Sequence, residues 1–139
     1  MTKQDSVGNA PYSNQDFDFF YRGLEEGKLL VQKCSICGTI RNPPSPGCAH
    51  CRSLDWQPFA LNGSGTVFSY TIHYHPPLPA FPVPHPVILA EMAEGIRMLG
   101  AADNTALEDI AIGAPIEAEF VQRGDNMSFR FRLKGSPAR

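Results

Sequence analysis

The chain has 139 residues, and its 12 basic and 14 acidic side chains leave the net charge close to zero. This balance argues against a protein that wraps nucleic acid, because such proteins usually carry a basic excess. No apolar run approaches the roughly 20 residues that cross a bilayer, and the polar stretch 1–15 lacks the apolar core of a signal peptide. We therefore expect a cytoplasmic protein without a membrane span.

The first predicted element is a helix over residues 13–26, which begins at a candidate capping residue, Ser13. The apolar positions that repeat with the spacing of one helix face are Phe17, Phe20, Tyr21 and Leu24. Gly27 follows and is typical of a helix end. We expect the apolar stripe to pack on the body of the protein, while Phe19, which lies off the stripe, is a candidate contact for a partner.

Four cysteines form two CxxC pairs, Cys34 with Cys37 and Cys48 with Cys51, and ten residues separate the pairs. A two-residue gap lets both sulfurs of a pair reach one ion from a tight turn, and zinc binds four thiolates in a tetrahedron at about 2.3 Å. A reduced cytosol favours a metal over disulfides. With four protein ligands the ion has no open position, so we interpret the centre as structural zinc, with rubredoxin-like iron as the alternative.

The residues around the cysteines refine this interpretation. Gly38, after the first pair, allows the backbone to fold back over the metal. Arg52 takes the matching place in the second pair, so we expect that turn to be less regular. His50 lies inside the second pair and is expected to face solvent or support the ligands from outside. A redox pair and a zinc deaminase are disfavoured, because no βαβ pattern and no His-x-Glu motif are present.

Five short strands are predicted after the cysteine block. They cover residues 66–73, 87–92, 96–101, 116–122 and 127–133, with one helical turn at 105–109. Tight turns are expected at 93–95 and at Arg123-Gly124-Asp125-Asn126. This order predicts a Greek-key barrel of the OB type. The expected protein is mainly β, with an N-terminal tail and helix (1–28), a rubredoxin-like zinc ribbon (29–57) and a five-stranded OB-fold barrel (58–139).

The last predicted strand alternates apolar and polar side chains, so one face should be buried and the other wet. Its apolar positions are Phe129, Phe131 and Leu133, and its polar positions are Ser128, Arg130 and Arg132. Glu117 and Glu119 lie on the strand before it. We expect these two glutamates to face the arginines across the hairpin.

Residues 73–86 contain six prolines and three of the four histidines of the chain. Proline cannot donate to a strand ladder, so we expect an extended loop between the first two barrel strands. The histidines are interpreted as polar tips on a wet loop, with metal or acid–base chemistry as the alternative. The candidate residues for a partner surface or a substrate entrance are His73, His75, Leu78, Phe81, Val83 and His85.

From about residue 13 to residue 134 the order of these motifs resembles the zinc-ribbon/OB-fold family that accompanies acyl-CoA enzymes. That order is an aromatic helix, a CxxC-x10-CxxC ribbon ending near Trp56, Gly65-Thr66-Val67, a proline-rich loop, a turn at Glu94-Gly95, and Ile112-Gly113-Ala114-Pro115 before a hairpin. The resemblance implies a non-catalytic subunit that docks on a thiolase-superfamily acyl-CoA enzyme, with a hydratase as a further partner in some members. It implies zinc at the four cysteines and supplies no catalytic residues.

Within that family, His75-Pro76-Pro77 and Ile112-Gly113 resemble the branch that partners the aldolase of sterol side-chain degradation. Three other functions stay open at this point. One is a stand-alone acyl-CoA-binding protein, in which Arg97, Arg130 or Lys134 would meet phosphates. The others are an OB-fold nucleic-acid-binding protein and an enzyme that uses the loop histidines.

Overall fold

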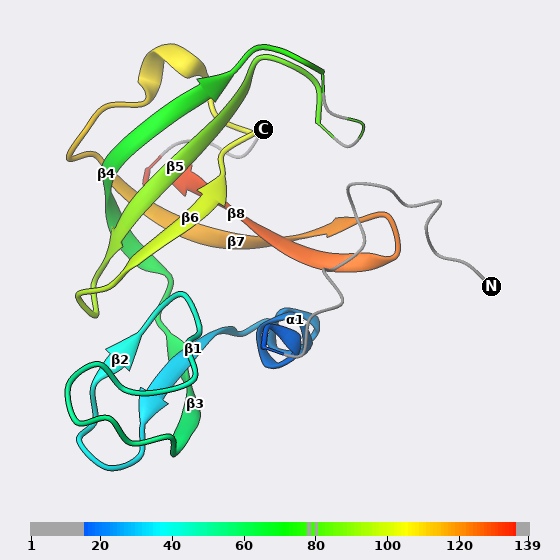
Figure 1. Cartoon of the computed structure of the whole chain (residues 1–139). Coiled ribbons are helices and arrows are strands. Elements are labelled where there is room, and N and C mark those ends of the chain that lie inside the picture. The colour runs from blue at the N-terminus through cyan, green and yellow to red at the C-terminus, as the bar shows by residue number, and fades with distance from the viewer. Residues whose placement is uncertain (1–15, 78, 80, 136–139) are drawn as a thin grey trace.

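Two antiparallel sheets and one α-helix make up the computed structural model, which describes residues 16–77, 79 and 81–135 (Figure 1). The helix is α1 (Asp18–Glu25). The strands are β1 (Leu29–Cys34), β2 (Ile40–Arg41), β3 (Trp56–Leu61), β4 (Ser64–His73), β5 (His85–Met92), β6 (Arg97–Ala101), β7 (Pro115–Arg123) and β8 (Asn126–Leu133), and a short 3-10 helix, η2 (Leu107–Asp109), precedes β7. The predicted order of a helix, a ribbon and a five-stranded barrel is confirmed.

The first sheet is the ribbon, with strand order β2-β1-β3. The β3 strand was not among the predicted strands, because Pro58 interrupts its pattern. Pro58 lies opposite Gln32 of β1 and is tolerated because β3 is an edge strand of this sheet. The strand runs to Leu61 and so crosses the boundary expected after residue 57.

The second sheet has the order β6-β5-β4-β7-β8 and curls into a nearly closed barrel. The long β4 strand pairs with β7 at its start and with β5 along most of its length, and its register shifts between Val67 and Ser69. At the open seam, β6 lies beside β8, where a Cβ on Gly100 would stand 2.7 Å from the Phe131 ring. A glycine is therefore needed at this close approach.

The β7–β8 hairpin has the predicted register. Glu117 lies opposite Arg132 and Glu119 lies opposite Arg130. Arg130 Nε donates to Glu119 Oε2 at 2.7 Å, and Arg132 pairs with Glu117. The turn consists of Gly124 and Asp125, and the positive φ of Gly124, 60°, suits a two-residue hairpin turn.

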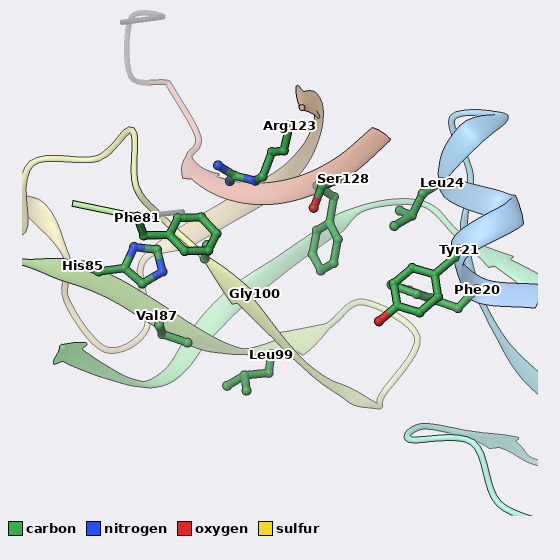
Figure 2. A pocket seen from close by; sticks show the side chains of 12 residues that line it. Phe20, Tyr21, Leu24, Phe81, His85, Val87, Leu99, Gly100, Arg123 and Ser128 are labelled. Atoms are coloured by element: carbon green, nitrogen blue, oxygen red, sulfur yellow. The ribbon is translucent and has the colours of Figure 1, made fainter. Parts of the chain in front are cut away.

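The α1 helix connects the two sheets. Its Phe19 packs against Trp56 of the ribbon in a tilted arrangement with ring centroids 4.8 Å apart, and its Phe20 meets Phe129 of the barrel at 6.0 Å. Figure 2 shows Phe20, Tyr21 and Leu24 turned toward the barrel. Phe19, a candidate partner contact, instead packs against Trp56 within the chain.

The helix begins at Asp18, and the predicted cap Ser13 lies outside the described residues. Leu24 is buried in one apolar cluster that also contains Leu29 of the ribbon and Ile88 of the barrel. The two sheets therefore share a core. Within the described residues no helix has the length and apolarity required to cross a membrane.

Candidate metal centre and ligand pocket

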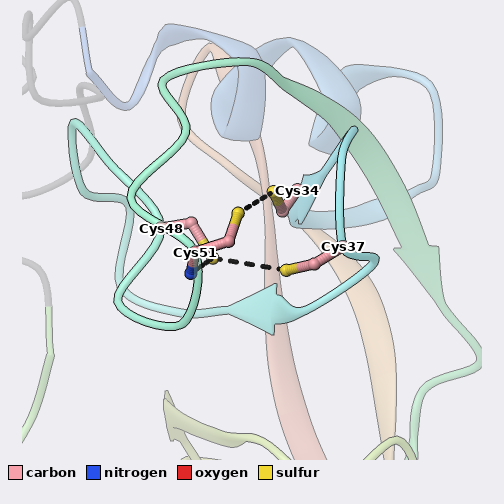
Figure 3. Close-up of side chains that lie close together, drawn as sticks. All are labelled: Cys34, Cys37, Cys48 and Cys51. Carbon is pink, nitrogen blue, oxygen red and sulfur yellow. Dashed lines mark hydrogen bonds between the residues drawn. The ribbon is translucent and has the colours of Figure 1, made fainter.

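The four cysteine sulfurs converge at the end of the ribbon (Figure 3). The Sγ atoms of Cys34 and Cys51 are 3.6 Å apart, as are those of Cys37 and Cys48, and all four lie within 4.8 Å of one another. A regular tetrahedron with bonds of about 2.3 Å would place its sulfurs about 3.8 Å apart. The four cysteines are therefore positioned to bind one metal ion.

The two cysteine turns have the same backbone form. The N–H of Gly38 donates to the Cys34 carbonyl at 3.0 Å, and the N–H of Arg52 donates to the Cys48 carbonyl at 2.8 Å. Gly38 has φ 81° and Arg52 has φ 69°. The expectation of a less regular second turn is wrong, because Arg52 adopts the left-handed conformation that the turn requires despite its side chain.

Hydrogen bonds to sulfur favour the thiolate form, which is the form that binds metal. The backbone N–H groups of Cys51 and His50 donate to Cys48 Sγ at 3.5 and 3.4 Å, and they lower the pKa of Cys48 to about 6. The Thr39 hydroxyl lies 3.1 Å from Cys37 Sγ and lowers the pKa of that thiol. His50 is exposed, as expected, and in the described part of the chain the candidate ligand group consists of the cysteines alone.

The proline-rich segment is shorter than predicted, because β4 continues to His73 and β5 begins at His85. His73 Nε2 lies 2.6 Å from the Pro76 carbonyl oxygen, and His75 is exposed. His85, expected on a wet loop, is only 5% exposed. The described residues bring no group of three histidines together as metal ligands. Val83 is half-buried, and Leu78 lies outside the described residues.

Phe81 belongs to a chain of contacts that holds this segment against the barrel. It stacks on His85 with ring centroids 4.2 Å apart, and the guanidinium of Arg123 lies 4.7 Å from the Phe81 ring centre. Arg123 in turn donates two hydrogen bonds to Asp103, at 2.9 and 3.2 Å. The segment is therefore tied through Phe81 to Arg123 of the β7–β8 hairpin, and the ion pair ties that arginine to Asp103, which follows β6.

Burial and charge shift the pKa values of His85 and Asp103, the two titratable groups at the ends of this series of contacts. Burial lowers the pKa of His85, which favours the neutral imidazole. Partial burial would raise the pKa of Asp103, but the hydrogen bonds and charge of Arg123 outweigh it and hold that pKa below its usual value. Sequence reasoning missed Asp103, because the residues that give it a role are distant in the sequence.

A pocket of about 330 Å³ opens next to this segment, between α1, β6 and the β7–β8 hairpin (Figure 2). Its lining includes Tyr21, Leu24, Phe81, His85, Leu99 and Ser128. Sequence analysis singled out Phe81 and His85 as candidate site residues. No local pattern indicated that the helix and the hairpin would meet them there.

Comparisons with known proteins agree with this architecture. Residues 22–57 match the family model described as "ChsH2, rubredoxin-like zinc ribbon domain", and residues 59–121 match "ChsH2, C-terminal OB-fold domain". A "DUF35 domain-containing scaffold protein" of Methanocaldococcus jannaschii is 30% identical over 84% of this chain and 87% of its own length. This chain belongs to the DUF35 family.

A solved structure described as "Ltp2-ChsH2(DUF35) aldolase" contains a chain that is 35% identical to this DUF35 chain, with a TM-score of 0.84. The match covers 89% of this chain and 98% of that one. A "Probable enoyl-CoA hydratase alpha subunit" of Thermomonospora curvata is 38% identical over 86% of this chain. The present chain spans only 38% of the length of that relative.

Proposed function

We propose that this DUF35 chain is a non-catalytic accessory subunit that docks on a thiolase-superfamily acyl-CoA enzyme and supports its activity. The observation that carries the proposal is the match at TM-score 0.84 to nearly the whole of a chain in the "Ltp2-ChsH2(DUF35) aldolase" structure. The scaffold name of the Methanocaldococcus relative points the same way. A retro-aldolase of sterol side-chain degradation is the narrower candidate for the partner, and a hydratase is a further one.

We assign zinc to the four cysteines, in a structural role. A centre with four protein thiolates leaves no position for water or substrate. The ion would stiffen the ribbon, whose Leu29 and Val31 belong to the same apolar cluster as Phe131 of the barrel. Metal binding would therefore fix both the ribbon and the barrel surface that meets a partner.

The outer surface of β4, β5 and β6 is the proposed docking face, which we define by Phe68, Leu89 and Leu99. Leu89 lies opposite Leu99 and Ser69, and Phe68 precedes Ser69 at the register shift of β4, so the three side chains are neighbours on one sheet. The exposed fractions of Phe68 and Leu99 are 42% and 63%. Large apolar side chains gathered on an exposed sheet favour a protein partner.

The β4–β5 segment continues from the docking face, because β4 and β5 carry that face and the segment joins them. We propose that this segment borders the substrate entrance of the partner. His75 and Val83 remain candidates for that border, as does Leu78. Phe81 and His85 would act indirectly, since they hold the segment against the barrel.

Two alternative functions find less support in the arrangement of charges. Arg97 lies 3.4 Å from Glu91 and packs on Phe68, while Arg130 is paired with Glu119. Arginines that are already neutralised are poor phosphate ligands, which weighs against both CoA and nucleic acid. Calorimetry of the isolated chain with CoA and acetyl-CoA tests the first alternative, and we expect no heat of binding.

Co-purification from the native host tests the proposal itself. The tagged chain should retain a larger thiolase-superfamily subunit, and the activity of that subunit should fall when the chain is withheld. Phe68→Glu should weaken the complex by about tenfold or more, because it places a charge in the docking face. Ile112→Glu is the matched control, since Ile112 is 70% exposed and lies outside that face. A chain that stays alone in the pull-down would overturn the proposal.

A further inference from the structure

The pocket described above occupies the position at which OB barrels bind their ligands. That position is formed by the second and third barrel strands, together with the loops that join strands one to two and four to five. In this chain those elements are β5, β6, the segment that carries Phe81, and the β7–β8 turn. β5, β6 and Phe81 of the segment contribute to the lining, and Arg123 and Ser128 line it from the strands beside the β7–β8 turn. The α1 helix adds Phe20 and Tyr21 as a further wall.

The size and walls of the pocket suit a compact apolar group. Its volume of about 330 Å³ lies at the lower end of the range for small-molecule sites, roughly 300–1,000 Å³. Phe129 and Phe20 face the pocket together with Leu24 and Val87. Aromatic side chains favour ring-shaped partners, because flat surfaces stack or meet edge to face.

The charges around the pocket favour an uncharged ligand. Arg123 is the one cation among the described lining residues that carries a fixed charge, and Asp103 already accepts two hydrogen bonds from it. The guanidinium is also covered by Phe81, and its side chain is only 15% exposed. A carboxylate or phosphate entering the pocket would therefore lose its hydration without gaining a free cation.

His85 provides a polar group at one end of the pocket, beside Phe81 (Figure 2). The residue is 95% buried, and its Nδ1 atom has no hydrogen-bond partner among the described residues. A buried polar atom without a partner is unfavourable, so a ligand that supplies one recovers free energy. A hydroxyl group can donate or accept, and it therefore suits either tautomer of the ring.

We propose that this pocket binds an uncharged, ring-containing hydrocarbon group with one hydroxyl, and that the hydroxyl is directed to the imidazole of His85. The site is built from residues of this chain alone, and one of them, Leu99, also belongs to the docking face. Because the test uses the chain without a partner, the proposal stands or fails separately from the proposed function.

A nuclear magnetic resonance titration of the full, metal-loaded chain tests the proposal with three probes of one shape. These are 2-naphthol, naphthalene and 2-naphthoate, each added up to its solubility limit. We expect 2-naphthol to shift the backbone amides of Gly100, Ala101 and Ser128. Naphthalene should bind about fivefold more weakly, because it lacks the hydrogen bond. The anionic 2-naphthoate should bind at least about tenfold more weakly than 2-naphthol, because its charge would be desolvated.

Two variants localise the effect. Ser128→Phe should fill the pocket and abolish the shifts, whereas Thr66→Phe adds the same ring at an exposed strand position outside the lining. His85→Phe keeps an aromatic partner for Phe81 and removes the imidazole. It should retain naphthalene binding but remove the preference for 2-naphthol.

Three results would overturn the proposal. The first is that 2-naphthol shifts no amides, or shifts amides outside the pocket. The second is that 2-naphthoate binds as tightly as 2-naphthol, and the third is that the His85→Phe variant still binds 2-naphthol more tightly than naphthalene. The dispersion of the amide spectrum shows whether each variant is folded. If Ser128→Phe is not folded, the wild-type titration and His85→Phe still decide the outcome.

Discussion

Gly38 and Arg52 occupy equivalent positions in the two cysteine turns, and both have a left-handed backbone, with φ 81° and 69°. Each N–H donates to the carbonyl of the first cysteine in its turn. Glycine adopts this conformation freely, whereas a residue with a Cβ is strained in it. The two cysteine turns therefore have the same backbone conformation, but this conformation costs more free energy at Arg52 than at Gly38.

We predict that Arg52→Gly stabilises the chain and that Gly38→Ala destabilises it. Arg52→Gly relieves backbone strain but also gives the unfolded chain more conformational freedom. The net increase in the free energy of unfolding should be at most about 1 kcal/mol. Gly38→Ala should remove about 1–2 kcal/mol. A Cβ at Gly38 would meet no atom within 4 Å, so its effect reports the backbone alone. Urea unfolding of the metal-loaded proteins measures both changes.

Arg52→Ala separates the side chain from the backbone. Alanine removes the guanidinium but keeps the strained conformation, so its stability should stay below that of Arg52→Gly. Equal stability of the alanine and glycine variants would show that the charge of Arg52, and not its backbone, sets the difference.

We expect each purified chain to contain one zinc ion, and its removal should unfold the ribbon. Structural zinc centres contribute on the order of 10 kcal/mol to folding. Elemental analysis measures the metal, and a colourless protein distinguishes zinc from iron. Trp56 fluorescence should change on chelation, because the ring packs against Phe19. Cys48→Ser should lose the metal, whereas His50→Ala should keep it.

One result would contradict the assignment of a metal to the four cysteines. It is that freshly isolated protein contains neither zinc nor iron and that alkylating reagents modify all four thiols in the native protein. In that case the arrangement of the sulfurs would have to be held by the ribbon alone.

The ion pair between Asp103 and Arg123 predicts a dependence of stability on pH. The folded-state pKa of Asp103 lies below its usual value, mainly because hydrogen bonds from Arg123 outweigh its partial burial. Its stabilising effect is therefore complete above the unfolded pKa of about 3.9 and is lost as the pH falls through the folded value. The difference in unfolding free energy between wild type and Asp103→Asn should shrink over that range.

Asp109→Asn is the matched control, because Asp109 is exposed and has no ion pair among those the structure records. Acid also weakens metal binding, but that effect is common to all three proteins and cancels in the differences. A difference between wild type and Asp103→Asn that stays constant down to acid pH would contradict the role assigned to the pair.

The parts of this fold that follow from local patterns were predictable. The spacing of the cysteines indicated a metal centre. The alternation of apolar and polar side chains along residues 128–133 indicated the register that pairs Glu119 with Arg130. The OB barrel followed from five strands with a helical turn before the fourth. In each case the signal consists of short-range patterns, read either singly or in their order along the chain.

What the sequence could not indicate depends on contacts between distant segments. The burial of His85 follows from Phe81, Arg123 and Asp103, which the chain brings together from three segments. The β3 strand contains Pro58, which is compatible with a strand only at an edge, and edge position is a property of the assembled sheet. The pocket likewise exists only after α1 and the hairpin have met.

Gly100→Ala should destabilise the chain by about 1–3 kcal/mol, because a Cβ there would stand 2.7 Å from the Phe131 ring and 2.9 Å from the Phe129 ring. Both rings belong to or pack against the buried core, so neither can move aside freely. Gly47→Ala is the matched control, since its Cβ would meet the flexible end of the exposed Leu54 side chain at 3.3 Å and the Ser53 carbonyl oxygen at an ordinary contact distance of 3.7 Å. Its change should stay within about 0.5 kcal/mol.

A double-mutant cycle with Phe131→Leu tests the cause of that loss. The smaller side chain makes room for the added methyl group, so the double variant should lose less stability than the sum of the two single changes. Urea unfolding of all four proteins gives the coupling free energy. Strict additivity would mean that the seam between β6 and β8 tolerates a Cβ at Gly100, and that the cost of Gly100→Ala arises elsewhere.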